Sequence, residues 1–164
     1  MIHGDTSRRS LLRGQFSAKS IKTALRPPGA IEESLFISAC SRCGDCITSC
    51  PEQIIIKSDG GFPSIDYSQR GCTGCGECQE VCPTLALSQQ GQKWPQGIAV
   101  IDDSCLAHKG VTCQSCKDSC ESSEVIHFNW QDRTPVPEIN TEHCTGCGEC
   151  ISVCPTNSIE VKQI

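Results

Sequence analysis

The sequence contains few aromatic residues and no long apolar stretch, and each shortage excludes a class of structure. Aromatic side chains account for 4 % of the 164 residues, with two Trp, one Tyr and four Phe. So small a set cannot fill a large aromatic-rich core. No run of about 20 apolar residues occurs, so the sequence predicts no membrane-spanning helix.

Patterns typical of enzymes and of nucleotide binding are also missing. The sequence has no G-x-G-x-x-G after a predicted strand and no phosphate-binding P-loop. Its carboxylates are scattered, and no nucleophile stands beside a general base. We therefore expect no catalytic residues and a protein that is not an enzyme. The formal net charge of −5 also disfavours binding to nucleic acid.

The N-terminus lacks the apolar segment of about 7–15 residues that a secretory signal requires. Asp5-Thr-Ser-Arg8-Arg9-Ser-Leu-Leu12 does look like the start of a twin-arginine export signal. The residues that follow, Gln15-Phe-Ser-Ala-Lys19-Ser-Ile-Lys22, are too charged to continue such a signal. We therefore expect a cytoplasmic protein, with twin-arginine export as the alternative.

Charge is distributed unevenly, because residues 1–26 carry a net charge of +5 and the remainder carries −10. A basic arm on an acidic body is typical of an interaction tail, although a solvated terminus would have the same composition. Residues 7–25 could form a basic amphipathic helix that binds a partner or makes weak contact with a membrane surface. Arg26-Pro27-Pro28-Gly29 would end such a helix and is predicted to be a linker.

Cysteine, in contrast, is abundant: sixteen residues fall into four groups that recur at intervals of about 32 positions, with a longer interval of 39 before the last group. Numbered in chain order, groups one, two and four have the spacing C-x2-C-x2-C-x3-C-P, the bacterial pattern for ligating iron–sulfur clusters. Disulfides would need an oxidising compartment and zinc usually takes separated C-x2-C pairs, so both are weaker alternatives. The groups are Cys40, Cys43, Cys46 and Cys50; Cys72, Cys75, Cys78 and Cys82; Cys105, Cys113, Cys116 and Cys120; and Cys144, Cys147, Cys150 and Cys154.

The fourth cysteine of such a run ligates the other cluster in two-cluster ferredoxins. Applied here, this exchange predicts four [4Fe–4S] clusters, each held by three cysteines of one group and one cysteine of its partner group. The predicted sets are Cys40, Cys43, Cys46 and Cys82; Cys72, Cys75, Cys78 and Cys50; Cys144, Cys147, Cys150 and Cys120; and Cys105, Cys113, Cys116 and Cys154.

Group three departs from the pattern. Seven residues separate Cys105 from Cys113, and Glu121 replaces the proline. We still expect a four-iron cluster there, with a three-iron or labile cluster as the alternative. His108 in the insertion could replace a ligand, but an exposed loop histidine is the simpler interpretation. His143, directly before group four, is expected to be a solvated neighbour.

Short β-prone segments follow every group and precede three of them, and Asp59-Gly60-Gly61 predicts a hairpin turn. We therefore predict an α+β fold of two tandem bacterial ferredoxin-like modules for two [4Fe–4S] clusters each, with pseudo-twofold repeats and a basic N-terminal arm. Pairing groups one with two and three with four is the simplest arrangement, and groups two with three nested inside one with four is the alternative. The predicted divisions are residues 1–34 for the arm and linker, 35–92 for the first module and 93–164 for the second.

Two tryptophans follow groups two and three at similar offsets. We expect Trp94 and Trp130 to cover clusters or pack the hairpins rather than to bind a substrate.

The chain resembles the NapF ferredoxin-type family of periplasmic nitrate reductase systems over nearly its whole length. The likeness rests on Asp5-Thr-Ser-Arg8-Arg9, on Arg26-Pro27-Pro28, on the four cysteine groups and on the long first gap of group three. The resemblance implies a cytoplasmic accessory protein that binds NapA, the catalytic molybdenum subunit, and helps its maturation before export. Either a cluster or electrons would pass to the iron–sulfur centre of NapA. A general polyferredoxin electron carrier to a membrane or periplasmic oxidoreductase is the alternative.

Overall fold

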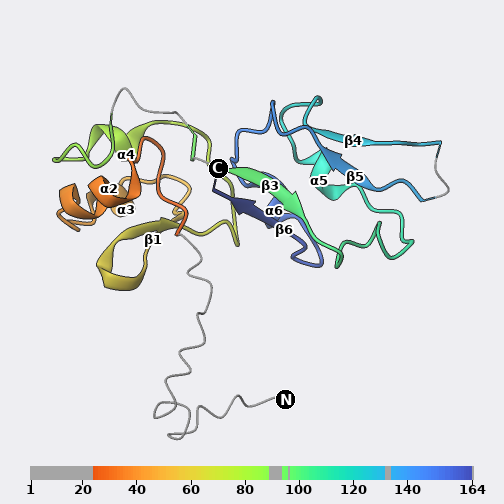
Figure 1. Cartoon of the computed structure of the whole chain (residues 1–164), viewed down its shortest axis with the longest axis horizontal. Coiled ribbons are helices and arrows are strands. Elements are labelled where there is room, and N and C mark those ends of the chain that lie inside the picture. The colour runs from red at the N-terminus through yellow and green to blue at the C-terminus, as the bar shows by residue number, and fades with distance from the viewer. Residues whose placement is uncertain (1–23, 89–93, 96, 132–133, 164) are drawn as a thin grey trace, which may run out of the picture.

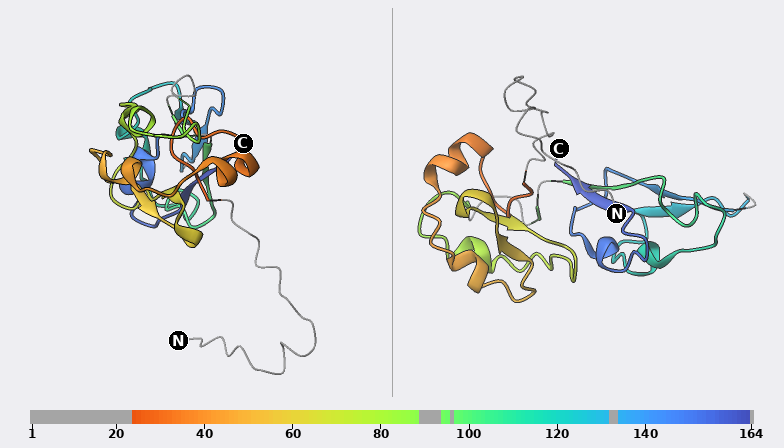
Figure 2. Two further views of the ribbon diagram at one scale, coloured as in Figure 1. Left: turned by 90° about the vertical axis from the view of Figure 1, so that its left-hand side faces the viewer. Right: turned by 90° about the horizontal axis from the view of Figure 1, so that it is seen from below.

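A computed structural model of the full chain describes residues 24–88, 94–95, 97–131 and 134–163. Its short helices and strands form a first module, residues 24–88, and a second module, residues 97–163, which lie side by side along the long axis (Figure 1). Figure 2 shows the same arrangement from two further directions. The helices are α2 (Glu33–Ala39), α3 (Asp45–Thr48), α4 (Glu77–Glu80), α5 (Ser115–Asp118) and α6 (Glu149–Ser152), with the 3-10 turn η1 (Asp59–Gly61). The strands are β1 (Ile55–Lys57), β2 (Pro63–Ile65), β3 (Ile98–Ile101), β4 (Ile126–Phe128), β5 (Pro137–Ile139) and β6 (Ile159–Lys162).

In the first module β1 and β2 form the hairpin that the sequence predicts. Their antiparallel register pairs Ile55 with Ile65, and η1 connects the two strands. Gly60 has a φ of 69° in this turn, a conformation that glycine tolerates because it lacks a Cβ atom. A second antiparallel contact, the bridge between Ala30 and Leu87, joins the start of the module to its end.

The second module has the same order of pairing. Its middle strands β4 and β5 form a hairpin, and its first strand β3 pairs with its last strand β6. Helix α3 packs against α4, and α5 packs against α6. Cysteine groups one and two therefore share one module and groups three and four share the other, which is the predicted tandem arrangement and not the nested one. The pseudo-twofold relation within each module stays a prediction.

Two small hydrophobic cores support the modules. The first gathers around Phe36, which is 0 % exposed, and the second around Ile126, which is 1 % exposed. Both cores include buried cysteines, so the cysteine groups and the cores are contiguous. Ile151 in α6 packs against both cores, which makes the two modules one continuous body.

Residues 25–31 differ from the predicted linker, because they pack into the first module. Arg26 is 9 % exposed, and its guanidinium donates to both carboxylate oxygens of Glu33 at 3.0 and 2.6 Å. It also donates to the carbonyl oxygen of Pro63 at 2.9 Å and lies 4.9 Å from the ring centroid of Phe36. Helix α2, which the sequence pattern did not predict, places Glu33 and Phe36 for these contacts.

Some predictions fall outside the described residues. They are the twin-arginine-like stretch and nearly all of the amphipathic helix, at residues 1–23, and the module boundary near residue 92. Among the helices that the structure describes, none has the length and apolar character needed to cross a membrane.

Candidate metal centres

Three cysteine groups enter a short helix through a glycine with positive φ. Gly44, Gly76 and Gly148 have φ values of 91°, 87° and 82° and stand at the N-caps of α3, α4 and α6. A side chain is disfavoured in this region, so glycine allows each loop to turn back sharply over its own thiols. Group three lacks this glycine, and Gln114, with a φ of −137°, precedes α5 instead.

The eight cysteines of the first module line two cavities, which we call sites I and II. Each site takes three cysteines from one group and the last cysteine of the other group. Packing of α3 against α4 brings these last cysteines across to the neighbouring loop. Site I is lined by Cys40, Cys43, Cys46 and Cys82, and site II by Cys72, Cys75, Cys78 and Cys50.

The second module repeats this exchange at sites III and IV. Site III is lined by Cys144, Cys147, Cys150 and Cys120, with Cys72 of site II at the border of the same cavity, and site IV is lined by Cys105, Cys113, Cys116 and Cys154. All four sets are the ones that the exchange rule assigns. Their ligation of clusters stays a prediction.

The insertion in group three does not keep its cysteines apart. The residues between Cys105 and Cys113 fold into a turn in which the Lys109 N–H donates to the Cys105 carbonyl at 3.2 Å. Ala107 is 2 % exposed and anchors this turn against the module. The wider loop therefore returns Cys113 to site IV beside its partners.

The innermost thiol of each site is protonated at neutral pH when no metal holds it. Burial raises the pKa of Cys46 and Cys116 to about 11, and that of Cys78 and Cys150 to about 12. Neighbouring thiols raise these pKa values further, and for Cys46 the neighbours are the other three thiols of site I. A metal must therefore displace protons from these sulfur atoms when it binds.

The donor set fits iron–sulfur clusters, for which thiolates are the usual ligands. All sixteen cysteines lie in the described part of the chain and are free thiols. Among the described residues, no three Cys, His, Asp or Glu converge at the distance of a single ion. A four-iron cube does not require such convergence, because each thiolate binds a different iron atom.

Backbone amides donate hydrogen bonds to some of the cysteine sulfurs that line the sites. The Ala99 N–H lies 3.4 Å from Cys144 Sγ at site III, and the Ser158 N–H lies 3.4 Å from Cys154 Sγ at site IV. The Ser158 hydroxyl is 3.2 Å from the same sulfur. Burial raises the pKa of Cys154, but hydrogen bonds from Ser158 and Thr156 together lower it below its usual value. Such bonds stabilise a thiolate and tune the potential of a cluster that it holds.

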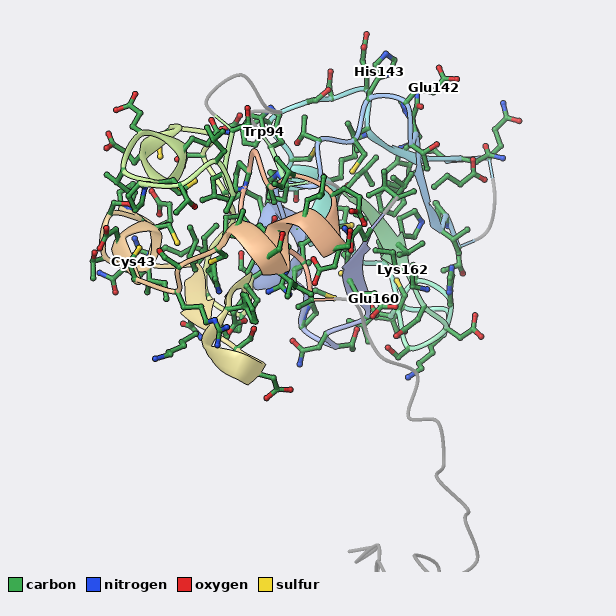
Figure 3. The ribbon with its side chains drawn as sticks, turned by 60° about the vertical axis from the view of Figure 1, so that its left-hand side comes forward. Cys43, Trp94, Glu142, His143, Glu160 and Lys162 are labelled. Atoms are coloured by element: carbon green, nitrogen blue, oxygen red, sulfur yellow. The ribbon has the colours of Figure 1, made fainter. Side chains whose placement is uncertain are left out.

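The two histidines near the cysteine groups, His108 and His143, lie at the surface of the second module. The Nδ1 atom of His108 lies 4.0 Å from the Asp103 carboxylate, in the exposed insertion. His143 borders site III at the surface of the second module (Figure 3). Its Nε2 atom lies 3.9 Å from the Glu124 carboxylate, and its Nδ1 atom lies 3.0 Å from the Asn140 side-chain amide. Both positions agree with the simpler interpretation of a solvated side chain.

Comparisons with known proteins give the same chemistry. A family model of the 4Fe-4S dicluster domain matches residues 39–86, and a model of the 4Fe-4S binding domain matches residues 137–160. The ferredoxin-type protein NapF of Escherichia coli (strain K12) is 33 % identical over 98 % of this chain and 96 % of that protein. The chain belongs to the NapF ferredoxin-type family. NapF of Haemophilus influenzae is 35 % identical over 96 % of this chain and 94 % of that protein.

The likeness reaches beyond the NapF family. The methylamine utilization ferredoxin-type protein MauM of Methylorubrum extorquens is 34 % identical over 90 % of this chain and 76 % of that protein. The two matched domain models leave out group three of this NapF-family chain. The geometry of site IV places Cys105, Cys113 and Cys116 of group three beside Cys154 of group four.

Sequence reasoning missed one residue beside the sites of this NapF-family chain. Tyr67, from the first module, donates its hydroxyl hydrogen to the Gly146 carbonyl in the loop of site III, at 2.7 Å. Burial raises the pKa of Tyr67 above its usual value, and the thiols of Cys72 and Cys147 raise it further, so the hydroxyl remains a donor. The available signal was that Tyr67 is the one tyrosine of the sequence and stands shortly before group two.

The two tryptophans of this NapF-family chain occupy different surroundings. Trp94 lies between the modules (Figure 3), where it lines the cavity of site III and packs against Gly74 in the loop of site II. Trp130 stacks on Phe128 at the end of β4, with ring centroids 5.6 Å apart. Trp130 therefore packs on a hairpin, as one of the two expected roles has it, and Trp94 borders the cavity of site III, while its covering of a cluster stays a prediction.

Proposed function

We propose that this NapF-family chain binds four [4Fe–4S] clusters at sites I to IV and acts as a ferredoxin-type accessory protein rather than as an enzyme. Bound clusters would supply one-electron redox chemistry or would themselves be delivered. The observation that carries this proposal is that each of four cavities brings together three cysteines of one group and the last cysteine of its partner group, with Cys72 of site II also bordering the cavity of site III. The paired modules hold these sets in place.

The more specific proposal concerns the client. We propose that the chain acts in the cytoplasm on NapA, the catalytic subunit of periplasmic nitrate reductase, and helps it mature before export. Family membership supports this role over nearly the whole chain. The basic residues 1–26, with a net charge of +5 before an acidic body, supply a segment suited to holding a client.

A general electron carrier is the second candidate, and one contact favours it. The Cys72 N–H at site II donates to the Cys147 carbonyl at site III, at 2.7 Å. Sites of the two modules are therefore neighbours, as a carrier with several centres in a row requires.

A pull-down from cytoplasm tests the proposed client. The bait is the full chain, compared with a chain that lacks residues 2–23. The deletion stops there because Leu25 and Arg26 pack into the first module. We expect the full chain to recover unexported NapA and the shortened chain to recover less, with exported NapA as the control. Failure of both forms to recover the unexported subunit would overturn the maturation role.

Cluster transfer separates the two candidates. Loaded chain is mixed anaerobically with cluster-free NapA, the proteins are separated, and iron is measured in each. A cluster donor should lose about four iron atoms for every client that gains them. A carrier should keep its iron through repeated cycles of reduction and oxidation.

A further inference from the structure

The modules meet at the loop of site III. Tyr67 is 6 % exposed, and its hydroxyl donates to the Gly146 carbonyl at 2.7 Å. The tyrosine ring lies directly against Gly148, where an added Cβ atom would stand 2.4 Å from ring carbons. A side chain of the first module thus holds the backbone between two ligands of the second.

The contact extends beyond one side chain. The Cys72 N–H donates to the Cys147 carbonyl at 2.7 Å, so backbone also bonds to backbone across the junction. Gly71 lies against Glu149, since a Cβ atom at Gly71 would stand 2.7 Å from that residue. The loop of site III is therefore held from the first module at several points.

The internal repeat does not explain Tyr67. Asp66 follows β2 and Asn140 follows β5, so the two residues are equivalent in the repeat. The Asp66 N–H donates to the Ile54 carbonyl at 2.8 Å, and the Asn140 N–H donates to the Val125 carbonyl at 2.7 Å. The next residue is the buried Tyr67 in the first module and the exposed Thr141 in the second. The tyrosine is thus present in the copy that faces the other module.

We infer that Tyr67 is a positioning residue for site III, and that this site is complete only when the first module is docked against its loop. The inference rests on the proposed binding of clusters. Its physical basis is that the buried hydroxyl fixes the Gly146 carbonyl, and with it the backbone that carries Cys144 and Cys147. Without the hydroxyl, that buried carbonyl loses its partner and the loop gains freedom.

Release of iron to a chelator tests the role of the hydroxyl. Tyr67→Phe keeps the ring and removes the hydrogen bond, so one quarter of the iron should leave about fivefold faster than in the wild type. Tyr67→Leu, which also removes the ring, should accelerate the same quarter further. Ser58→Ala is the matched control and should leave iron release unchanged, because it also removes a hydroxyl that donates to a backbone carbonyl, that of Phe62 at 2.9 Å, but lines none of the four cavities. Gel filtration verifies that each variant is folded.

Cysteine variants identify the affected site. The acceleration by Tyr67→Phe should disappear in a Cys147→Ala background, which lacks site III, and persist in a Cys113→Ala background, which lacks site IV. Release at the wild-type rate, or an acceleration that persists without Cys147, would overturn the inference while the proposed function stands. A wild-type chain that holds no iron at site III would overturn both.

Discussion

The exchange of fourth cysteines can be tested by counting iron in paired substitutions. Cys82 follows the loop of site II along the chain, but it lines site I with Cys40, Cys43 and Cys46. Alanine offers no ligand atom, so each disabled site should lose its cluster of about four iron atoms. From about 16 iron atoms per chain, Cys82→Ala should therefore leave about 12.

The double variants distinguish the two possible assignments. If Cys82 belongs to site I, Cys43→Ala with Cys82→Ala disables one site and leaves about 12 iron atoms per chain. Cys75→Ala with Cys82→Ala then disables sites I and II and leaves about 8. The single variants of Cys43 and Cys75 supply the baseline for each site.

The assay is iron and acid-labile sulfide per chain, measured after anaerobic loading and brief exposure to a chelator. Unfolded chain is removed by gel filtration before counting. The reverse result, about 8 iron atoms with the Cys43 partner and about 12 with the Cys75 partner, would mean that each group ligates its own cluster. The geometry assigned to sites I and II would then be wrong.

Three further predictions concern the fold and the thiols. Gly148→Ala should lower the free energy of unfolding by about 2–4 kcal/mol, because its φ of 82° disfavours a Cβ atom and that atom would also clash with the Tyr67 ring. Gly44→Ala should lower it by only about 1–2 kcal/mol, because its added Cβ atom would have no neighbour within 4 Å. Anaerobic urea unfolding measures both, and equal costs would contradict the junction contact. Phe36→Ala should cost about 3–5 kcal/mol in the same assay, since Phe36 is fully buried, and a loss below about 1 kcal/mol would show that it is not a core residue. Iron release should accelerate as pH falls, because the innermost thiols, such as Cys46 and Cys78 with pKa values of about 11 and about 12, take up protons when iron leaves. Stopped-flow measurement of iron release at several pH values checks this. Faster release at higher pH would refute it.

Features that depend on local sequence were predictable. The cysteine spacing and the β-prone segments indicated the tandem modules, and the predicted turn at residues 59–61 connects β1 to β2. The packing of residues 25–31 was not predictable from local pattern. Arg26-Pro27-Pro28-Gly29 has the composition of a linker, and burial of Arg26 depends on Glu33 and on the Pro63 carbonyl, which lies far along the chain.

The internal repeat does not predict the residues that join the two modules. Equivalent positions suggest two equal units, but Ile151 in α6, which packs against both cores, corresponds to Gln79 in α4. Tyr67 likewise has a threonine as its counterpart. A simple tether would leave sites II and III free to separate, whereas the buried tyrosine and the bond from Cys72 to Cys147 fix them as neighbours. The four sites therefore follow one another in the order I, II, III, IV. Site I, with its exposed Cys43, lies at one end, away from Trp94 between the modules (Figure 3). Site IV, which the insertion of group three borders, lies at the other end.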